Sequence, residues 1–319
     1  MSNTETAPDP VVCGGDAPAV ELVTPREVPL GGPRAMTVRR TLPRRVRSLI
    51  GAWCFIDHFG PDRVSDTGGM AVPGHPHTGL QTVSWLFEGE VEHRDTTGAH
   101  AVIRPGEVNL MTAGHGIAHS EFSLPGTDVL HGVQLWLALP SAHRRTAPAF
   151  EHHAPPRTDL DGAGLRVFLG SLAGVTSPVA TFSPLLGAEL VLPAGGSVAP
   201  EVSASFEHGV LVDTGTVDVC GTTAGPGELV YLPPGRTTLP LRTGDGARLL
   251  LLGGEPLGEQ IVMWWNFVGA THDEIAAHRA AWRAARATGG DAQFGAFPDE
   301  WESTLPAPEL PNARLTPRE

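Results

Sequence analysis

The sequence contains no lysine. All 22 of its basic residues are arginine, which excludes any mechanism that depends on a lysine Schiff base. Cysteine is also scarce, since Cys13, Cys54 and Cys220 are the complete set and no two of them form a Cys-x-x-Cys spacing. An odd number of widely separated cysteines argues against a disulfide framework and a thiolate zinc site. We therefore expect a reducing compartment, the cytoplasm.

Long hydrophobic runs and a surplus of positive charge are missing as well. No apolar run approaches the roughly 18 residues of a membrane-spanning helix, and the first residues, MSNTETAPDP, do not resemble a signal peptide. The net charge of -13 repels a phosphate backbone. The one basic cluster, RRTLPRRVR at 39–47, is more typical of a solvated or substrate-facing edge than of a nucleic-acid patch. We expect neither membrane nor direct nucleic-acid contact.

Short apolar or alternating runs, separated by Gly, Pro, Asp and Thr, fill most of the chain. Examples are LQTVSWLFEGEV and VLHGVQLWLAL in the first half and HGVLVDTGTVDV and ARLLLLGG in the second. Regularly spaced strands of this kind predict an all-β sandwich or barrel. The expected divisions are an N-terminal arm (1–35), a first barrel (36–140), a linker (141–164), a second barrel (165–262), and a C-terminal helix with an extended tail (263–319).

The two strand-rich stretches are copies of one pattern. WLFEGEV at 85–91 aligns with LVDTGTV at 211–217, and RPGEVNLMTAG at 104–114 aligns with GPGELVYLPPG at 225–235. Each copy reads strand, Gly turn, strand, Pro-Gly turn, strand, which predicts two similar domains. Helical periodicity occurs only at the end, in THDEIAAHRAAWRAARA, where Thr271 and Glu274 form a capping box.

The run GHPHTGLQTVSWLFEGE at 74–90 places two histidines before an alternating strand. Side chains at i and i+2 of an extended segment share a face, so His75 and His77 point the same way. His119 and Glu121, in GHGIAHSEFS, form a second pair of this kind. If both segments meet inside a barrel, three imidazoles and one carboxylate converge on a set suited to iron, manganese, cobalt, nickel, copper or zinc.

The second copy provides an internal control. Aligned on the Gly turns, the positions of His75, His77, His119 and Glu121 are taken there by Glu201, Ser203, Pro240 and Arg242. The turns recur while all four candidate ligands are lost. Residues that served the fold alone would be needed in both copies, so the pattern predicts one metal site, in the first copy only.

The run from CFIDHFGP through HPHTGLQTVSWLFEGEVEHRD to RPGEVNLMTAGHGIAHSE resembles the pirin family of the cupin superfamily. MWWN at 263–266 is similar to the ending of one pirin subgroup. The resemblance implies a bicupin, two double-stranded β-helix barrels in one chain, with iron in the N-terminal barrel and none in the C-terminal one. The ligands that it implies are His75, His77, His119 and Glu121. Gln81 departs from the glutamate usual in the first cupin motif.

Some members of this family are quercetin 2,3-dioxygenases, and others act as transcriptional cofactors or regulators of metabolic enzymes. The dioxygenase interpretation predicts Fe(II), or another divalent first-row metal, with a small aromatic substrate and O2. In it, Glu121 is the catalytic residue that accepts the proton of the substrate hydroxyl group. One alternative is a non-enzymatic, metal- or redox-dependent regulator that acts on a protein partner. Another is a cupin isomerase with a different divalent metal.

Further residues are expected at the pocket or behind the ligands. Gln81 and His115 are candidates to hydrogen-bond a ligating imidazole or the substrate, and His58 is placed near the pocket mouth. The aromatic residues expected either to pack in the core or to form apolar walls of the pocket are Phe55, Trp85, Phe122 and Trp136. The histidines expected at the surface are His93, His100, His152 and His153.

Overall fold

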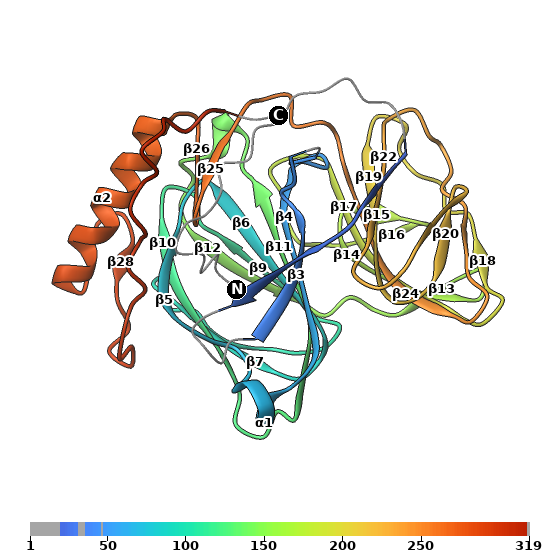
Figure 1. Ribbon diagram of the computed structural model, residues 1–319, viewed down its shortest axis with the longest axis horizontal. Coiled ribbons are helices and arrows are strands. Elements are labelled where there is room, and N and C mark those ends of the chain that lie inside the picture. Colours follow the sequence, from blue (N-terminus) through green and yellow to red (C-terminus); the bar gives the residue numbers. More distant parts are fainter. Residues whose placement is uncertain (1–19, 31–35, 46, 318–319) are drawn as a thin grey trace.

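The computed structural model describes residues 20–30, 36–45 and 47–317. Two β-barrels lie side by side, and one long helix packs on the side of the first barrel that faces away from the second (Figure 1). The predicted all-β class, with two barrels and a C-terminal helix, is confirmed. Residues 1–19, most of the predicted N-terminal arm, lie outside the described residues.

In the part of the chain that the structure describes, eleven strands build the first barrel. They are β2 (Arg26–Leu30), β3 (Met36–Leu42), β4 (Trp53–Arg63), β5 (Ala71–His77), β6 (Leu80–Glu88), β7 (Val91–Asp95), β8 (His100–Ile103), β9 (Val108–Thr112), β10 (Ile117–Ser123), β11 (Val129–Ala138) and β12 (Ala149–His153). A seven-stranded sheet has the order β12-β9-β6-β11-β4-β3-β2, and a four-stranded sheet has the order β5-β10-β7-β8.

The second barrel repeats this arrangement. Its strands are β1 (Glu21–Val23), β13 (Thr158–Leu160), β14 (Ala163–Leu169), β17 (Leu185–Leu192), β18 (Ser197–Val198), β19 (Glu207–Gly215), β20 (Val217–Val219), β21 (Thr222–Ala224), β22 (Leu229–Leu232), β23 (Leu241–Arg242) and β24 (Ala247–Gly254). The sheet orders are β1-β22-β19-β24-β17-β14-β13 and β18-β23-β20-β21. β6 and β19, which carry one half of the sequence repeat, occupy equivalent positions, as do β9 and β22.

The remaining elements are short apart from one helix. They are α1 (Val64–Thr67), η1 (Ser141–His143), β15 (Ser171–Leu172), β16 (Val175–Thr176), β25 (Val262–Trp264), β26 (Phe267–Gly269), α2 (His272–Thr288), β27 (Gly290–Asp291) and β28 (Gly295–Ala296). The predicted linker contains β12, which pairs with β9, and β13, which pairs with β14. It therefore adds an edge strand to each barrel, and the exact domain boundaries stay predictions.

The large sheets of the two barrels pack against each other through a shared apolar core. On β4, β6 and β11 one set of alternating side chains, including Val83, Trp85 and Leu135, is buried against Phe168 and Leu250 of the second barrel. The other set faces the interior of the first barrel. Burial of each such side chain stabilises the fold by about 1.5–3 kcal/mol, so the two barrels support each other.

The arginine cluster at 39–47, expected at a solvated or substrate-facing edge, is only partly solvated, because Arg45 is exposed but Arg40 is buried. Arg40 is only 2% exposed and forms a bidentate ion pair with Asp57, at 2.7 and 2.8 Å. The guanidinium of Arg47 bonds Glu21 at 2.6 Å and lies over the ring of Tyr231. These contacts hold the strands together, so the cluster serves the fold.

Helix α2 begins as predicted. The Thr271 hydroxyl accepts a hydrogen bond from the Glu274 N–H, and the Glu274 carboxylate accepts one from Ala270. The segment after α2 runs back over the helix and β5, because Trp282 donates to the Leu305 carbonyl at 2.8 Å and Leu305 donates to the Gly74 carbonyl. Among the described residues, neither helix has the length and apolarity to cross a membrane.

Candidate metal centre

Strands β5 and β10 bring the two predicted pairs together. They run antiparallel with His119 directly opposite His75 and Ile117 opposite His77. Residues opposite each other on one face have Cβ atoms about 5 Å apart. The ring centroids of His75, His77 and His119 lie 4.2, 5.0 and 5.1 Å from one another, and one ligand atom from each lies within 4.8 Å of the others.

Burial keeps these three imidazoles neutral. Each side chain is fully inaccessible to solvent. Burial lowers the pKa of His75 to about 3, although the charge of Glu121 raises it. Burial, and then the charge of His75, lower the pKa values of His77 and His119 well below the usual value. Neutral imidazole is the form that ligates a metal.

The donor atoms fit a divalent transition metal. Within the described part of the chain, the Nε2 atoms of His75, His77 and His119 are buried and have no hydrogen-bond partner. A buried polar atom left unpaired costs about 1–3 kcal/mol, so three of them in one place need a common partner. An ion that accepts three imidazole lone pairs satisfies all of them.

Glu121 lies beside this group on its His119 side. Its side chain is buried, and a carboxylate oxygen comes within 4.8 Å of ligand atoms of His93 and His119. The Ser84 hydroxyl donates to its Oε1 at 3.5 Å. A shift in the β5–β10 register falls between His119 and Glu121, so the carboxylate is offset along the strand from the three imidazoles. The resulting set is three histidines with one adjacent carboxylate.

His93 is the functional residue that the sequence analysis missed. It was expected at the surface, but it is only 2% exposed and its Nδ1 lies 3.3 Å from Nδ1 of His119. Its Nε2 bonds Asp95 at 2.9 Å. The sequence VEHRD did contain a signal for its burial. Val91, His93 and Asp95 alternate along the strand and share the buried face of β7.

Two of the predicted aromatic walls lie at the site. The ring of Trp136 meets that of His77 edge-on at 5.1 Å and stacks on Phe55 at 4.0 Å. Gln81 is buried on β6, where its amide donates to the Thr112 hydroxyl at 2.9 Å. That bond joins neighbouring strands, and the predicted second role of Gln81 stays a prediction.

The other two aromatic residues do not line the site. Trp85 faces the second barrel, where it stacks on Phe168 at 4.7 Å and donates to the Glu189 carboxylate at 2.9 Å. Phe122 is 37% exposed because it follows Glu121 and so points out of the barrel. Trp85 therefore packs in the core, the other role expected for these aromatic residues, and Phe122 points outward. Alternation sets which residues share a face but not which face is the interior.

His58 lies at the junction of the barrels and not at a pocket mouth. Its Nε2 bonds Asp213 at 2.8 Å, and His131 bonds the same carboxylate oxygen at 2.6 Å. Arg248 bonds the other oxygen, and Arg39 lies 3.3 Å from His58. Ligand atoms of His58, His131 and Asp213 lie close enough together to hold a metal. The neighbouring guanidinium groups oppose a further cation, so the cluster is an ion-pair network.

This network predicts a pH-dependent contribution to stability. Burial alone raises the pKa of Asp213, but the bonds from His131 and His58 outweigh it and hold the pKa below the usual value. The contribution is therefore present above the unfolded-state pKa of about 3.9 and is lost as the pH falls below it. Asp213→Ala should lower the free energy of unfolding by about 3–5 kcal/mol at pH 7, with a smaller difference in urea titrations below pH 4.

A matched control is Glu90→Ala, which removes an exposed ion pair with Arg104. Exposed pairs contribute about 0–1 kcal/mol, so its urea midpoint should barely change. Equal losses in the two variants would contradict the role given to Asp213.

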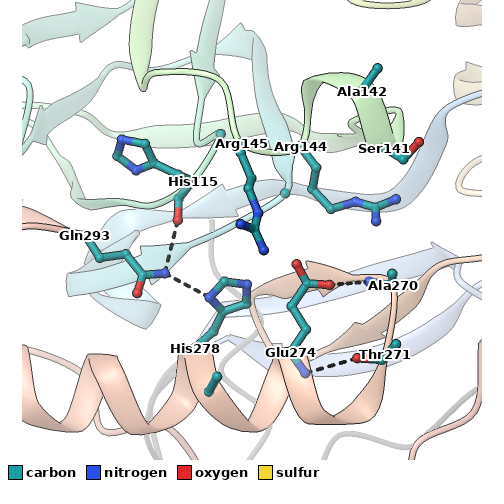
Figure 2. A pocket seen from close by; sticks show the side chains of 13 residues that line it. His115, Ser141, Ala142, Arg144, Arg145, Ala270, Thr271, Glu274, His278 and Gln293 are labelled. Atoms are coloured by element: carbon teal, nitrogen blue, oxygen red, sulfur yellow. Dashed lines mark hydrogen bonds between the residues drawn. The ribbon is translucent and has the colours of Figure 1, made fainter.

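His115 lines a separate cavity of about 850 Å³ between the first barrel and α2. Figure 2 shows it there, with its carbonyl accepting from Gln293, which also bonds His278 of α2. The side chain is exposed, and the residues that line this cavity do not include His75, His77 or His119. The prediction that His115 supports a ligand or the substrate has no contact behind it in this structure.

The MWWN run forms a hairpin against the end of β5. Trp264, the last residue of β25, and Trp265, in the turn before β26, are both buried. The Val268 N–H donates to the Thr78 carbonyl at 3.0 Å, one residue beyond His77. Gly79 must be glycine here, because its φ is +69° and a Cβ would lie 2.2 Å from the Val268 carbonyl oxygen. The hairpin thus fixes the strand end that carries His77.

Comparison with known proteins identifies the family of the chain. Family models described as pirin and pirin C-terminal cupin domain match residues 35–137 and 187–288. The chain belongs to the pirin family. Whether this pirin falls in the MWWN subgroup stays a prediction.

Relatives of this pirin are similar along most of their length. A Pseudomonas aeruginosa protein named "putative quercetin 2,3-dioxygenase" is 45% identical over 98% of both chains. A pirin-like protein of Caulobacter vibrioides is 35% identical over 85% of this chain and 94% of its own. The crystal structure of a quercetin 2,3-dioxygenase from Acinetobacter baumannii has a TM-score of 0.87, with 36% identity, and covers 94% of this chain and 98% of its own.

Proposed function

We propose that this pirin is a quercetin 2,3-dioxygenase that uses one divalent metal, Fe(II), held by His75, His77, His119 and Glu121. The observation that carries the proposal is the convergence of three neutral imidazoles whose buried Nε2 atoms have no other partner among the described residues. The names of two relatives, 45% and 36% identical, support the reaction type.

In the proposed reaction a flavonol and O2 give a ring-opened ester and carbon monoxide. The bound ion supplies Lewis acidity and a template for the deprotonated 3-hydroxyl group. The chain supplies the proton acceptor, because a carboxylate oxygen of Glu121 lies within 4.8 Å of a ligand atom of His119. Proton transfer to a positioned carboxylate contributes typically 10²–10⁴-fold to a rate.

Trp136 suits a flat aromatic substrate. It stands between the His77 ring and Phe55 in a stacked arrangement with an interplanar angle of 12° to Phe55. Aromatic pairs of this kind are worth about 0.5–1.5 kcal/mol beyond their buried area. We propose that a flavonol ring packs on this pair while its hydroxyl group faces Glu121.

The test is an assay of iron-loaded protein with quercetin, prepared without oxygen and started by adding it. We expect O2 uptake with release of carbon monoxide in equal amounts, and neither in the absence of metal. If iron, manganese, cobalt, nickel and copper all fail to support turnover while a protein partner co-purifies, the proposal is wrong and the regulatory alternative gains.

A further inference from the structure

Asp95, His93 and His119 form a line of contacts that ends at the candidate metal centre. Oδ2 of Asp95 lies 2.9 Å from Nε2 of His93, and Nδ1 of His93 lies 3.3 Å from Nδ1 of His119. All three side chains are 2% exposed or less. The far nitrogen of His119, Nε2, is the one that has no partner in the described chain.

The direction of each hydrogen bond follows from the carboxylate. Oδ1 of Asp95 accepts from the backbone N–H groups of Thr97 and Ala99, and Oδ2 faces Nε2 of His93, so the buried group is placed as a carboxylate that only accepts. A neutral His93 then carries its proton on Nε2, which leaves a lone pair on Nδ1. That lone pair can accept only from an Nδ1–H of His119. The Nε2 lone pair of His119 is thereby left free for a metal.

We infer that Asp95 and His93 are positioning residues that fix the tautomer and the ring orientation of His119 for metal binding. The inference rests on the proposed function in one respect, that His119 is a ligand. Outer partners of this kind also raise the basicity of a ligating imidazole, and losing one typically weakens metal affinity 10–100-fold. In many metal sites one carboxylate bonds the ligating histidine directly. Here Asp95 bonds His93, and His93 in turn bonds His119.

The surroundings of His93 favour positioning over direct ligation. Its ring stacks on Phe150 at 4.7 Å with an interplanar angle of 26°, which fixes its plane. Asp95 is itself fixed, because its Oδ1 accepts from the N–H groups of Thr97 at 2.8 Å and Ala99 at 3.3 Å. His93 touches Nδ1 of His119 and not its unpartnered Nε2.

Asp95→Asn tests this line with almost no change in shape. The two N–H groups keep the Asn oxygen at the Oδ1 position, so the amide NH2 faces His93 and donates to its Nε2. His93 must then carry its proton on Nδ1, and His119 must carry its own on Nε2, where the metal binds. We expect the dissociation constants of Fe(II) and Co(II) to rise about 10–100-fold in chelator competition, with one ion per chain at saturation.

Nitrogen-15 NMR of the imidazoles in metal-free protein gives a second readout. We expect His119 to be protonated on Nδ1 in the natural protein and on Nε2 in Asp95→Asn. Glu92→Gln is the matched control, because Glu92 is a carboxylate on the same strand that bonds a histidine, His100, on the outer face at 2.8 Å. It should leave both the metal affinity and the tautomer unchanged.

A second variant separates positioning from ligation. His93→Gln keeps an acceptor for His119, so it should still bind one ion per chain, with weaker affinity. Loss of the ion from His93→Gln would make His93 a ligand and overturn the inference, as would an unchanged affinity in Asp95→Asn. Because the NMR measurement needs no metal, it can succeed even if the dioxygenase proposal fails.

Discussion

His75→Ala and His119→Ala are each expected to give a folded protein that retains no stoichiometric metal and has no dioxygenase turnover. Each change removes one of three converging imidazoles, and a Lewis acid of this kind supplies several kcal/mol of transition-state stabilisation, equivalent to a rate factor on the order of 10³ or more. Neither side chain belongs to the apolar clusters of the core, so the barrels should persist. Elemental analysis, circular dichroism and O2 uptake measure the three quantities.

Arg242→Ala is the control in the other copy of the repeat. The aligned turns of the sequence pair Arg242 with Glu121, and Arg242 is exposed on β23, so metal content and turnover should equal those of the natural protein. If His75→Ala and His119→Ala kept a full complement of tightly bound metal, the proposed ligand set would be wrong. If they failed to fold, these histidines would have a structural role that we do not assign.

Trp85→Ala is expected to lower the free energy of unfolding by about 3–5 kcal/mol. The side chain is completely buried between the barrels, where its removal leaves a cavity beside Phe168. It also leaves one oxygen of the Glu189 carboxylate without its indole donor, which adds to the loss. Metal affinity should change little, because the ring points away from His77. Urea unfolding and chelator competition measure the two effects.

Phe122→Ala provides the comparison. Trp85 and Phe122 were both expected in the core or as pocket walls, but Phe122 is on the outer face of β10. Its removal should change the free energy of unfolding by no more than about 0.5 kcal/mol. A Trp85→Ala protein as stable as Phe122→Ala would contradict the packing described for the two barrels.

The histidine cluster was predictable because it depends on local geometry. Spacing of i and i+2 places His75 with His77 on one face whatever the rest of the fold does. The repeat then indicated the domain organisation, because the same Gly turn and Pro-Gly turn occur in both halves of the chain and so predict two similar domains. The loss of all four ligand types from the second copy pointed to the first barrel, and their counterparts Glu201, Ser203 and Arg242 are exposed.

The pocket residues were less predictable because both faces of the large sheet are buried. In a sheet with one wet face, polarity separates inside from outside. Here Val83 and Trp85 pack on the second barrel while Ser84 faces Glu121, so hydrophobicity does not separate the two faces of β6. To assign the faces, one would have to know one residue of β6 that faces the interior and then count every second residue from it. That knowledge comes from the strand pairing, which only the structure gives.

Two further features depend on contacts distant in sequence. His58 meets Asp213 across the two barrels, a pairing that no local spacing encodes. The register shift between His119 and Glu121 depends on how β10 pairs with β5, and it moves the carboxylate along the strand. His93 differs from these, because the alternation of β7 was already visible in the sequence and was not used.

The most direct test of the metal centre is anomalous X-ray diffraction from crystals grown with Fe(II) under anaerobic conditions, with data collected on both sides of the iron absorption edge. We expect one strong anomalous peak per chain in the first barrel, about 2.0–2.2 Å from nitrogens of His75, His77 and His119. We expect no peak among the corresponding residues of the second barrel. A peak at the junction of the barrels, or no peak in the first barrel, would contradict the proposed metal centre.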